Sequence, residues 1–348
     1  MYVSPPVLSR LGWDELYAAA FIAMAPPATV AARVLSVASR SVTVMSEDGQ
    51  REAALTGRLR ASPPIGGVTT GDWVAVDDST VHGVVPRRSV LLRRAAGNAA
   101  VAQAVAANVD VVFIAVPLGA GVAMRRLERS LAMVWSSDAR PVVLLTKSDL
   151  SDDLPTDMAL ARAVASGAEV IAVCAAGAGV DAVRSCLPAA RTGAIIGPSG
   201  AGKSTLINVL SDAARMATAP VRDDGRGRHT TSNRELVELA HGGLLIDTPG
   251  MREMGVWDAQ AGIDAVFADV NAVASQCRFG DCSHTSEPGC AVRRAAEHDP
   301  AILERLAALR KLEREQRFQE LQVDLRLRAD ERRDHRRRAK ALRSQPHR

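Results

Sequence analysis

The feature that most constrains this chain is a glycine-rich stretch, Gly197-Pro198-Ser199-Gly200-Ala201-Gly202-Lys203-Ser204, followed by Thr205. It matches the phosphate-loop pattern G-x-x-x-x-G-K-[ST], with an apolar run before it and an amphipathic segment after it. The glycines let backbone N–H groups turn toward phosphates, and a following helix adds its positive N-terminal end. Lys203 is expected to reach the β- and γ-phosphates, and Ser204 to ligate Mg²⁺. The pattern predicts nucleoside triphosphate binding; the alternative is an ordinary turn before a helix.

A second motif, Thr146-Lys147-Ser148-Asp149, follows a predicted buried strand. The carboxylate of Asp149 can accept hydrogen bonds from N1–H and the amino group of guanine, while the stem of Lys147 covers the base. Adenine offers neither donor there, and sites that hydrogen-bond a specific group discriminate strongly against analogues that lack it. The motif therefore favours GTP over ATP.

The sequence Asp247-Thr248-Pro249-Gly250 also ends a predicted strand. Asp247 is expected to hold Mg²⁺ through water, and the backbone N–H of Gly250 to sense the γ-phosphate. The segment between the phosphate loop and this motif offers Thr230 or Thr231 as a further Mg²⁺ ligand, and the sequence does not decide which.

The catalytic group is less evident. Met251 stands where many GTPases place a glutamine that orients water, and a thioether cannot do this. His229 is the best candidate in the chain, because it lies beside the metal threonines and can hydrogen-bond water near neutral pH. The alternative is a histidine that faces solvent.

The order of these motifs is unusual. The guanine motif precedes the phosphate loop, and the D-x-P-G motif comes last, so the cyclic order of a GTPase is kept while the chain ends have moved. Strands and helices alternate from about residue 108, which predicts a doubly wound α/β domain. Cys174 stands in the loop that would back the base, where we expect it to pack, as we do Cys186.

The amino-terminal part has a different predicted secondary structure from the α/β domain. Short β-rich runs separated by polar turns, from about residue 29 to 94, predict a small barrel of the OB type. Trp73 is interpreted as core rather than as a stacking surface. A basic edge follows the barrel and either contacts phosphates or faces solvent: Arg87, Arg88, Arg93 and Arg94.

Beyond residue 257, the spacing Cys277-x₄-Cys282-x-His284-x₅-Cys290 supplies three thiolates and one imidazole. Such a set closes a tetrahedral zinc site and leaves no open position, so the zinc is expected to be structural. A chance group of buried thiols is the alternative. A helix with regularly spaced leucines is predicted over residues 301–322.

Taken together, the barrel, the permuted motifs and the Cys-Cys-His-Cys spacing resemble the RsgA/YjeQ family of circularly permuted GTPases. The resemblance spans roughly residues 30–312, although Thr146 replaces the family's usual asparagine. It implies GTP hydrolysis stimulated by the small (30S) ribosomal subunit, contact with 16S rRNA and a role late in subunit maturation. The expected divisions are a leader (1–28), the barrel (29–97), the permuted GTPase domain (98–256), a helical zinc unit (257–322) and a basic tail (323–348).

Composition sets the remaining limits. The net charge is +4, but residues 331–348 contain eight Arg or Lys against two acids, which suggests a polyanionic partner for the tail; a solvated tail without a partner is the alternative. Five cysteines are not a disulfide framework, and no signal peptide or membrane span is recognised, so we expect a cytoplasmic monomer without a membrane partner. Two other readings stay open: a P-loop ATPase or kinase with an unrelated zinc module, and a GTP-dependent RNA-binding module with little turnover.

Overall fold

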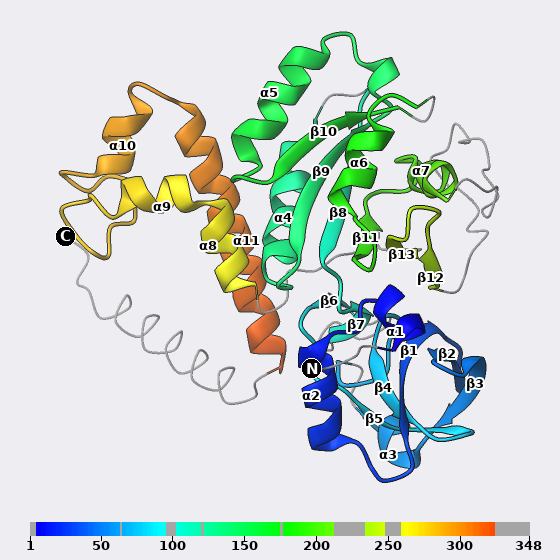
Figure 1. The fold of residues 1–348 in the computed structure, drawn as a ribbon. Helices are drawn as coiled ribbons and strands as arrows, with labels where there is room; N and C mark the ends of the chain where they lie inside the picture. Colours follow the sequence, from blue (N-terminus) through cyan, green and yellow to red (C-terminus); the bar gives the residue numbers. More distant parts are fainter. Residues whose placement is uncertain are drawn as a thin grey trace, which may run out of the picture.

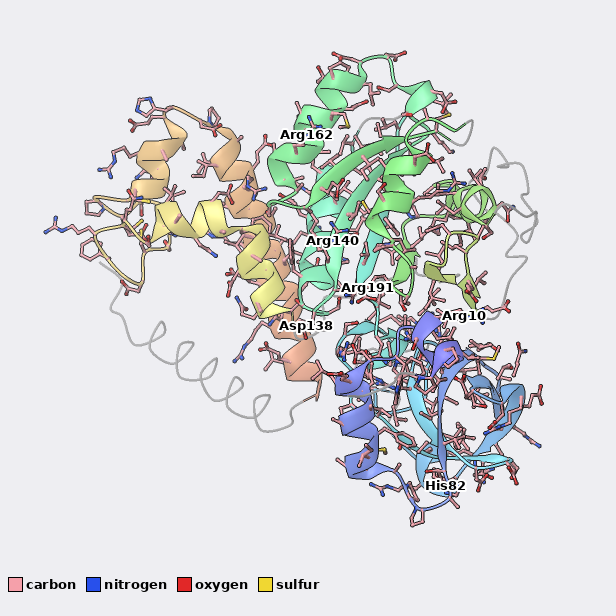
Figure 2. The ribbon with its side chains drawn as sticks, in the orientation of Figure 1. Arg10, His82, Asp138, Arg140, Arg162 and Arg191 are labelled. Atoms are coloured by element: carbon pink, nitrogen blue, oxygen red, sulfur yellow. The ribbon has the colours of Figure 1, made fainter. Side chains whose placement is uncertain are left out.

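The computed structural model describes residues 5–62, 65–94, 102–119, 122–174, 177–211, 234–247 and 259–323. Figure 1 shows a barrel at one end of a central sheet, with the carboxy-terminal helices along one flank of that sheet.

The barrel is closed and has the strand order β1-β2-β3-β5-β4. Alternate side chains point inward, and valine and alanine fill the small interior, as in Val34, Val44 and Val74. The expected OB-type barrel is confirmed. Its elements are β1 (Val30–Val37), β2 (Ser41–Ser46), β3 (Gly49–Leu55), α3 (Gly57–Arg60), β4 (Trp73–Val76) and β5 (Thr80–Val84).

Two helices precede the barrel, α1 (Pro6–Arg10) and α2 (Glu15–Met24). The carboxylate of Asp14 accepts hydrogen bonds from the first N–H groups of α2, which fixes where this helix begins. Trp13 then packs edge-on against Trp73, with ring centroids 4.7 Å apart. Trp73 is completely buried, so its interpretation as a core residue is confirmed.

A two-stranded hairpin, β6 (Val90–Arg94) and β7 (Ala102–Ala107), leads from the barrel to the central sheet. The six strands of that sheet lie in the order β10-β9-β8-β11-β13-β12. All neighbours are parallel except β12, which pairs antiparallel with β13 at one edge. The strands are β8 (Val111–Pro117), β9 (Arg140–Thr146), β10 (Glu169–Val173), β11 (Thr192–Ile196), β12 (Leu236–Glu238) and β13 (Leu244–Asp247).

Helices cover both faces of the sheet, as the alternating pattern predicts. On one face, Leu131 of α4 and Val164 of α5 belong to the larger hydrophobic core. On the other, Val183 of α6 and Leu206 of α7 pack in a separate core with Phe113 of β8. The elements are α4 (Met124–Trp135), the short 3₁₀ helix η1 (Ser148–Leu150), α5 (Leu154–Val164), α6 (Val180–Cys186) and α7 (Lys203–Leu210).

Among residues 259–323, the last range that the structure describes, there are four helices: α8 (Gln260–Val266), α9 (Ala268–Ala274), α10 (Ala291–Ala296) and α11 (Ala301–Val323). Gly262 brings α8 very close to α4, because a Cβ at this position would overlap the carbonyl oxygen of Ala132 and the hydroxyl of Ser136. The predicted leucine helix is confirmed as α11, although Leu303 is 45% exposed and only the later leucines are buried.

Arg305 of α11 holds this arrangement together. Its guanidinium forms a two-pronged ion pair with Asp269, at 2.6 and 2.8 Å, and donates to the carbonyl oxygen of Val266. It also reaches the buried carboxylate of Glu128 on α4 at 3.1 Å. Burial raises the pKa of Glu128, and the facing Arg305 opposes that rise. One side chain therefore joins α8, α9 and α11 to the central domain.

A buried polar junction joins the barrel to the central domain. The guanidinium of Arg33 on β1 is 1% exposed and donates to the carbonyl oxygens of Leu11 and Asn108 and to the hydroxyl of Thr192. Burial lowers the pKa of Arg33 to about 10. The guanidinium therefore stays charged at neutral pH and ties three separate segments to the barrel.

The expected basic edge is partly internal. Arg87 forms a two-pronged ion pair with the buried carboxylate of Asp72, at 2.8 and 2.9 Å. Arg88 pairs with Asp14 at 2.5 Å. These two arginines therefore brace the barrel and its leading helices and are not simply a solvated face.

Candidate nucleotide site and Cys/His cluster

The phosphate-loop sequence forms a tight connection between β11 and α7. Gly197 has a φ of +148°, and a Cβ there would lie 2.6 Å from the carbonyl oxygen of Ala115 on the neighbouring strand. Gly202 has a φ of +82° and stands directly before α7, which begins at Lys203. The glycines are therefore required by backbone conformation and by close approach, as the pattern predicts. Pro198, Ser199, Gly200 and Ala201 span the turn, and Ser204 and Thr205 lie in the first turn of α7.

Lys203 lies over its own loop. Its ammonium group donates to the carbonyl oxygens of Gly197 and Pro198, at 2.9 and 2.7 Å. A cation in this position sits beside the N-terminus of α7, where phosphate oxygens are attracted by both the charge and the unpaired N–H groups.

The predicted guanine motif begins at the end of β9. Lys147 has a left-handed backbone with a φ of +56°, which turns the chain out of the strand and into η1, where Ser148 and Asp149 lie. Thr146 is buried, and its hydroxyl donates a 2.8 Å hydrogen bond to the carbonyl oxygen of Ala201 in the phosphate loop. The two motifs, which are separated by about fifty residues in sequence, are thus directly bonded.

The carboxylate of Asp149 is also positioned by a neighbour. A hydrogen bond from the thiol of Cys174 holds the pKa of Asp149 below its usual value, with smaller contributions from its own backbone N–H and from Lys147. The lowered pKa keeps Asp149 ionised at neutral pH, the state in which a carboxylate accepts hydrogen bonds. Cys174 is only half-buried, so the prediction that it packs is less accurate than the same prediction for Cys186, which is buried.

The parallel register brings these motifs to one edge of the sheet. Thr146 pairs with Val173 at the end of β10, Ile196 with Ile114 of β8, and Ile195 with Asp247 at the end of β13. Ligands of open α/β sheets bind outside the carboxyl ends of the strands. The phosphate loop, the guanine motif, the loop after β10 and the start of the D-x-P-G motif share that location (Figure 1).

Several predicted residues fall outside the described part of the chain. They are His229, Thr230, Thr231, Thr248, Pro249, Gly250 and Met251; for Asp247 only the backbone is described.

The four predicted metal ligands meet in the segment between α9 and α10. The sulfur atoms of Cys277, Cys282 and Cys290 and a ring nitrogen of His284 all lie within 4.8 Å of one another. Nδ1 of His284 is 3.5 Å from the sulfurs of both Cys277 and Cys290. A tetrahedral zinc about 2.3 Å from each thiolate holds sulfurs roughly 3.8 Å apart, so this donor set fits the ion with small adjustments.

Sequence reasoning missed three groups around these sites. The bond from Cys174 to Asp149 was not foreseen, although its position in the base-backing loop was a usable signal. The roles of Gly262 and Arg305 had no sequence signal, because each depends on which helices pack together.

The sequence of this chain is similar to those of one known protein family. The family model described as RsgA GTPase matches residues 84–257. The small ribosomal subunit biogenesis GTPase RsgA of Streptomyces coelicolor is 41% identical over 340 residues, which cover 95% of this chain and 92% of that protein. The chain belongs to the RsgA GTPase family.

Solved structures support the same fold. The crystal structure of YjeQ from Thermotoga maritima matches with a TM-score of 0.59 and 23% identity, covering 82% of this chain and 98% of that one. The structure of YloQ, described as a circularly permuted GTPase, matches with a TM-score of 0.53 and 21% identity, covering 82% of this chain and 95% of that one. The permuted architecture inferred from motif order is therefore confirmed. In the described residues, no helix combines the length and apolar character needed to cross a membrane.

Proposed function

We propose that this chain hydrolyses GTP to GDP and phosphate with Mg²⁺, that the small (30S) ribosomal subunit stimulates this reaction, and that it acts late in subunit assembly. The observation that carries the proposal is the hydrogen bond from Thr146 to Ala201, which joins a guanine-type motif to a phosphate loop on one sheet edge. The names of the relatives, small ribosomal subunit biogenesis GTPases, supply the partner.

The residues proposed to bind GTP lie in three motifs. The phosphate loop, residues 197–205, would surround the phosphates, with Lys203 on the β- and γ-phosphate oxygens. Residues 146–149 would bind the guanine, with Asp149 accepting from its two donors. Asp247 and Gly250 would sense the metal and the γ-phosphate. Mg²⁺ would be ligated by Ser204 and by Thr230 or Thr231, and by Asp247 through water.

His229 is proposed to orient the attacking water. Its support is the sequence: it precedes the two candidate metal threonines, and Met251 cannot serve in this role. The small subunit is proposed to place His229 against this water. Because the thioether of Met251 cannot orient water, slow basal turnover is expected of the isolated chain.

The cluster of Cys277, Cys282, His284 and Cys290 is proposed to bind one structural Zn²⁺. Zinc binding in such a set contributes folding free energy, which a short segment rich in Gly, Ser and Pro needs. The zinc would hold residues 275–290 as one unit beside α9 and α10.

The proposed partner is 16S rRNA. The chain is proposed to bind it as a monomer in the cytoplasm and to have no membrane partner. The proposed domain limits are those of the sequence: 1–28, 29–97, 98–256, 257–322 and 323–348. The basic tail, with a net charge of +6 over residues 331–348, adds electrostatic attraction to phosphates.

The decisive experiment measures release of phosphate from GTP by the full chain, with purified small subunits added or withheld. The proposal expects slow turnover alone and a large stimulation by subunits. ATP that competes as well as GTP would favour a P-loop ATPase or kinase. Tight GTP-dependent binding without stimulated turnover would favour an RNA-binding module that uses GTP only as a signal.

A further inference from the structure

The last strand of the central sheet, β12, is in contact with strand β1 of the barrel. Glu235, directly before β12, forms an antiparallel bridge with Ser36 of β1. The bridge lies at a β-bulge, where the pairing of β1 with β2 shifts between Val34 and Ser36. A bulge bends its strand locally, and here the bend falls where β1 meets the sheet. Figure 1 shows β12 at the end of the central domain that adjoins the barrel.

A barrel loop, residues 69–71, makes a second contact with the same edge of the sheet. The hydroxyl of Thr70 donates a 3.3 Å hydrogen bond to the carbonyl oxygen of Arg234, next to Glu235. Thr70 is 1% exposed, so water has little access to replace this bond. The N–H of Ala107 on β7 donates to the carbonyl oxygen of Thr70 at 3.0 Å, which holds the loop from its other side.

The same loop also touches β13. Gly71 has a φ of +89°, and a Cβ there would lie 2.2 Å from the carbonyl oxygen of Ala107 and 3.0 Å from Cδ1 of Ile246. Glycine is required here by both the backbone conformation and the close approach. The barrel loop therefore contacts the chain just before β12 and the side chain next to the end of β13.

These two places adjoin groups that are proposed to bind Mg²⁺. Arg234 follows Thr231 by three residues, and Ile246 directly precedes Asp247. In GTPases, the threonine ligand is ordered by the γ-phosphate and Mg²⁺ and is released after hydrolysis. A contact that already holds the chain at Arg234 lowers the conformational entropy lost when GTP orders that ligand. GDP, which lacks the γ-phosphate, gains nothing from the same contact.

We propose that Thr70 is a positioning residue for GTP: through the backbone of Arg234, it fixes the chain beside the Mg²⁺ threonines. The inference rests on the proposed function and adds that the barrel helps to distinguish GTP from GDP. Because such coupling is reciprocal, a partner that moves loop 69–71 changes the preference for GTP. The competing interpretation is that Thr70 only stabilises the junction, which would affect both nucleotides equally.

The test measures binding of a non-hydrolysable GTP analogue with Mg²⁺, and of GDP, to the full chain, by competition with a fluorescent GDP derivative. Thr70→Val removes the donor and should weaken binding of the analogue roughly 5-fold, as expected for one buried hydrogen bond. Its affinity for GDP should stay within about 2-fold of the wild type, because GDP does not use the ordered threonine. Thr70→Ser retains the hydroxyl and should keep the wild-type ratio of the two affinities.

Thr69→Val is the matched control. Thr69 adjoins Thr70 and is also buried, but its hydroxyl donates to the carbonyl oxygen of Ala104 on β7, at 3.4 Å. This variant removes a hydroxyl from the same loop without touching the chain before β12, so the affinity ratio should not change. The urea midpoint of each variant reports the purely structural cost.

An unchanged ratio in Thr70→Val, or equal losses for both nucleotides, overturns the inference and leaves the proposed function intact. A wild type that binds no guanine nucleotide overturns the proposed function itself. If Thr70→Val does not fold, amide hydrogen exchange of wild-type residues 69–76 decides the question. Slower exchange with the GTP analogue than with GDP supports the coupling, and identical exchange contradicts it.

Discussion

The hydroxyl of Thr146 donates a 2.8 Å hydrogen bond to the carbonyl oxygen of Ala201, and both residues are at least 96% buried. Threonine stands here where the family resemblance leads us to expect asparagine. The shorter side chain reaches the phosphate loop because β9 and β11 end at the same edge, one on each side of β8.

Thr146→Val should loosen the phosphate loop. Valine keeps the shape of threonine but removes the donor, which leaves the buried carbonyl of Ala201 unpaired at a cost of about 1–3 kcal/mol. We expect a lower urea midpoint and roughly 10-fold weaker GTP binding, by titration with a fluorescent GTP analogue. Thr146→Ser, which retains the hydroxyl, is the control. Identical affinity of the valine variant and the wild type would show that the bond does not support the site.

Asp149→Asn should change the base preference. The amide presents a donor to guanine, whereas xanthine has a carbonyl in place of the amino group and can accept from it. GTP affinity should fall roughly 100-fold, and xanthosine triphosphate should bind better than GTP. Competition binding measures both, and Asp152→Asn, at an exposed neighbouring acid, is the control. Unchanged GTP affinity would remove Asp149 from the site.

Gly262→Ala should destabilise the contact between α8 and α4. The added methyl group would overlap the carbonyl oxygen of Ala132, and separating the helices costs about 1–3 kcal/mol. Gly280→Ala is a matched control, because a Cβ at Gly280 meets no atom within 4 Å. Urea unfolding of both variants checks the prediction, which fails if their midpoints coincide.

Cys282→Ser should release zinc and loosen the chain from about residue 257 onward. Zinc sites of this kind contribute roughly 10 kcal/mol or more of apparent binding free energy in small peptides. Metal analysis should show less than one equivalent, while GTP binding persists because the phosphate loop belongs to a separate core. Cys186→Ala, outside the cluster, should retain the metal. Absence of zinc from well-folded wild-type protein would contradict the assignment.

His229→Ala should separate binding from turnover. The variant should bind GTP normally but lose most of the stimulation by small subunits, since the imidazole is proposed only to orient water. His298→Ala, an exposed histidine between α10 and α11, serves as the control. Full stimulation of the His229 variant would place the catalytic group elsewhere in this chain or on the ribosome.

The sequence predicted the structure best where the local preference of the residues matches the element that they form in the fold. The β-rich region predicted from about residue 29 begins with β1 at Val30, and the phosphate-loop helix begins where the motif requires. By contrast, residues 102–107, Ala-Gln-Ala-Val-Ala-Ala, have the composition of a helix yet form β7, because they pair with β6. Pairing with a partner outweighs intrinsic preference there, and no local signal reveals it.

The candidate sites also contain some features that the sequence predicts and others that it does not. Motif spacing was enough to predict the Cys/His cluster, because its ligands are close in sequence and chemically distinctive. The bond from Thr146 to Ala201 could not be predicted, since it depends on where separate loops end after the sheet has assembled. The place of Cys174 in the base-backing loop was a signal for its bond to Asp149.

The buried guanidinium of Arg33 has a consequence for how this protein can be divided or recombined. A barrel cut away from the rest of the chain would carry that charge on a surface with none of its three acceptors, and a central domain without the barrel would keep acceptors with no donor. Breaking a buried polar pairing from one side commonly costs several kcal/mol. The barrel is therefore not an interchangeable module: grafting it onto another GTPase, or replacing it with another barrel, requires the recipient to supply the equivalents of Leu11, Asn108 and Thr192.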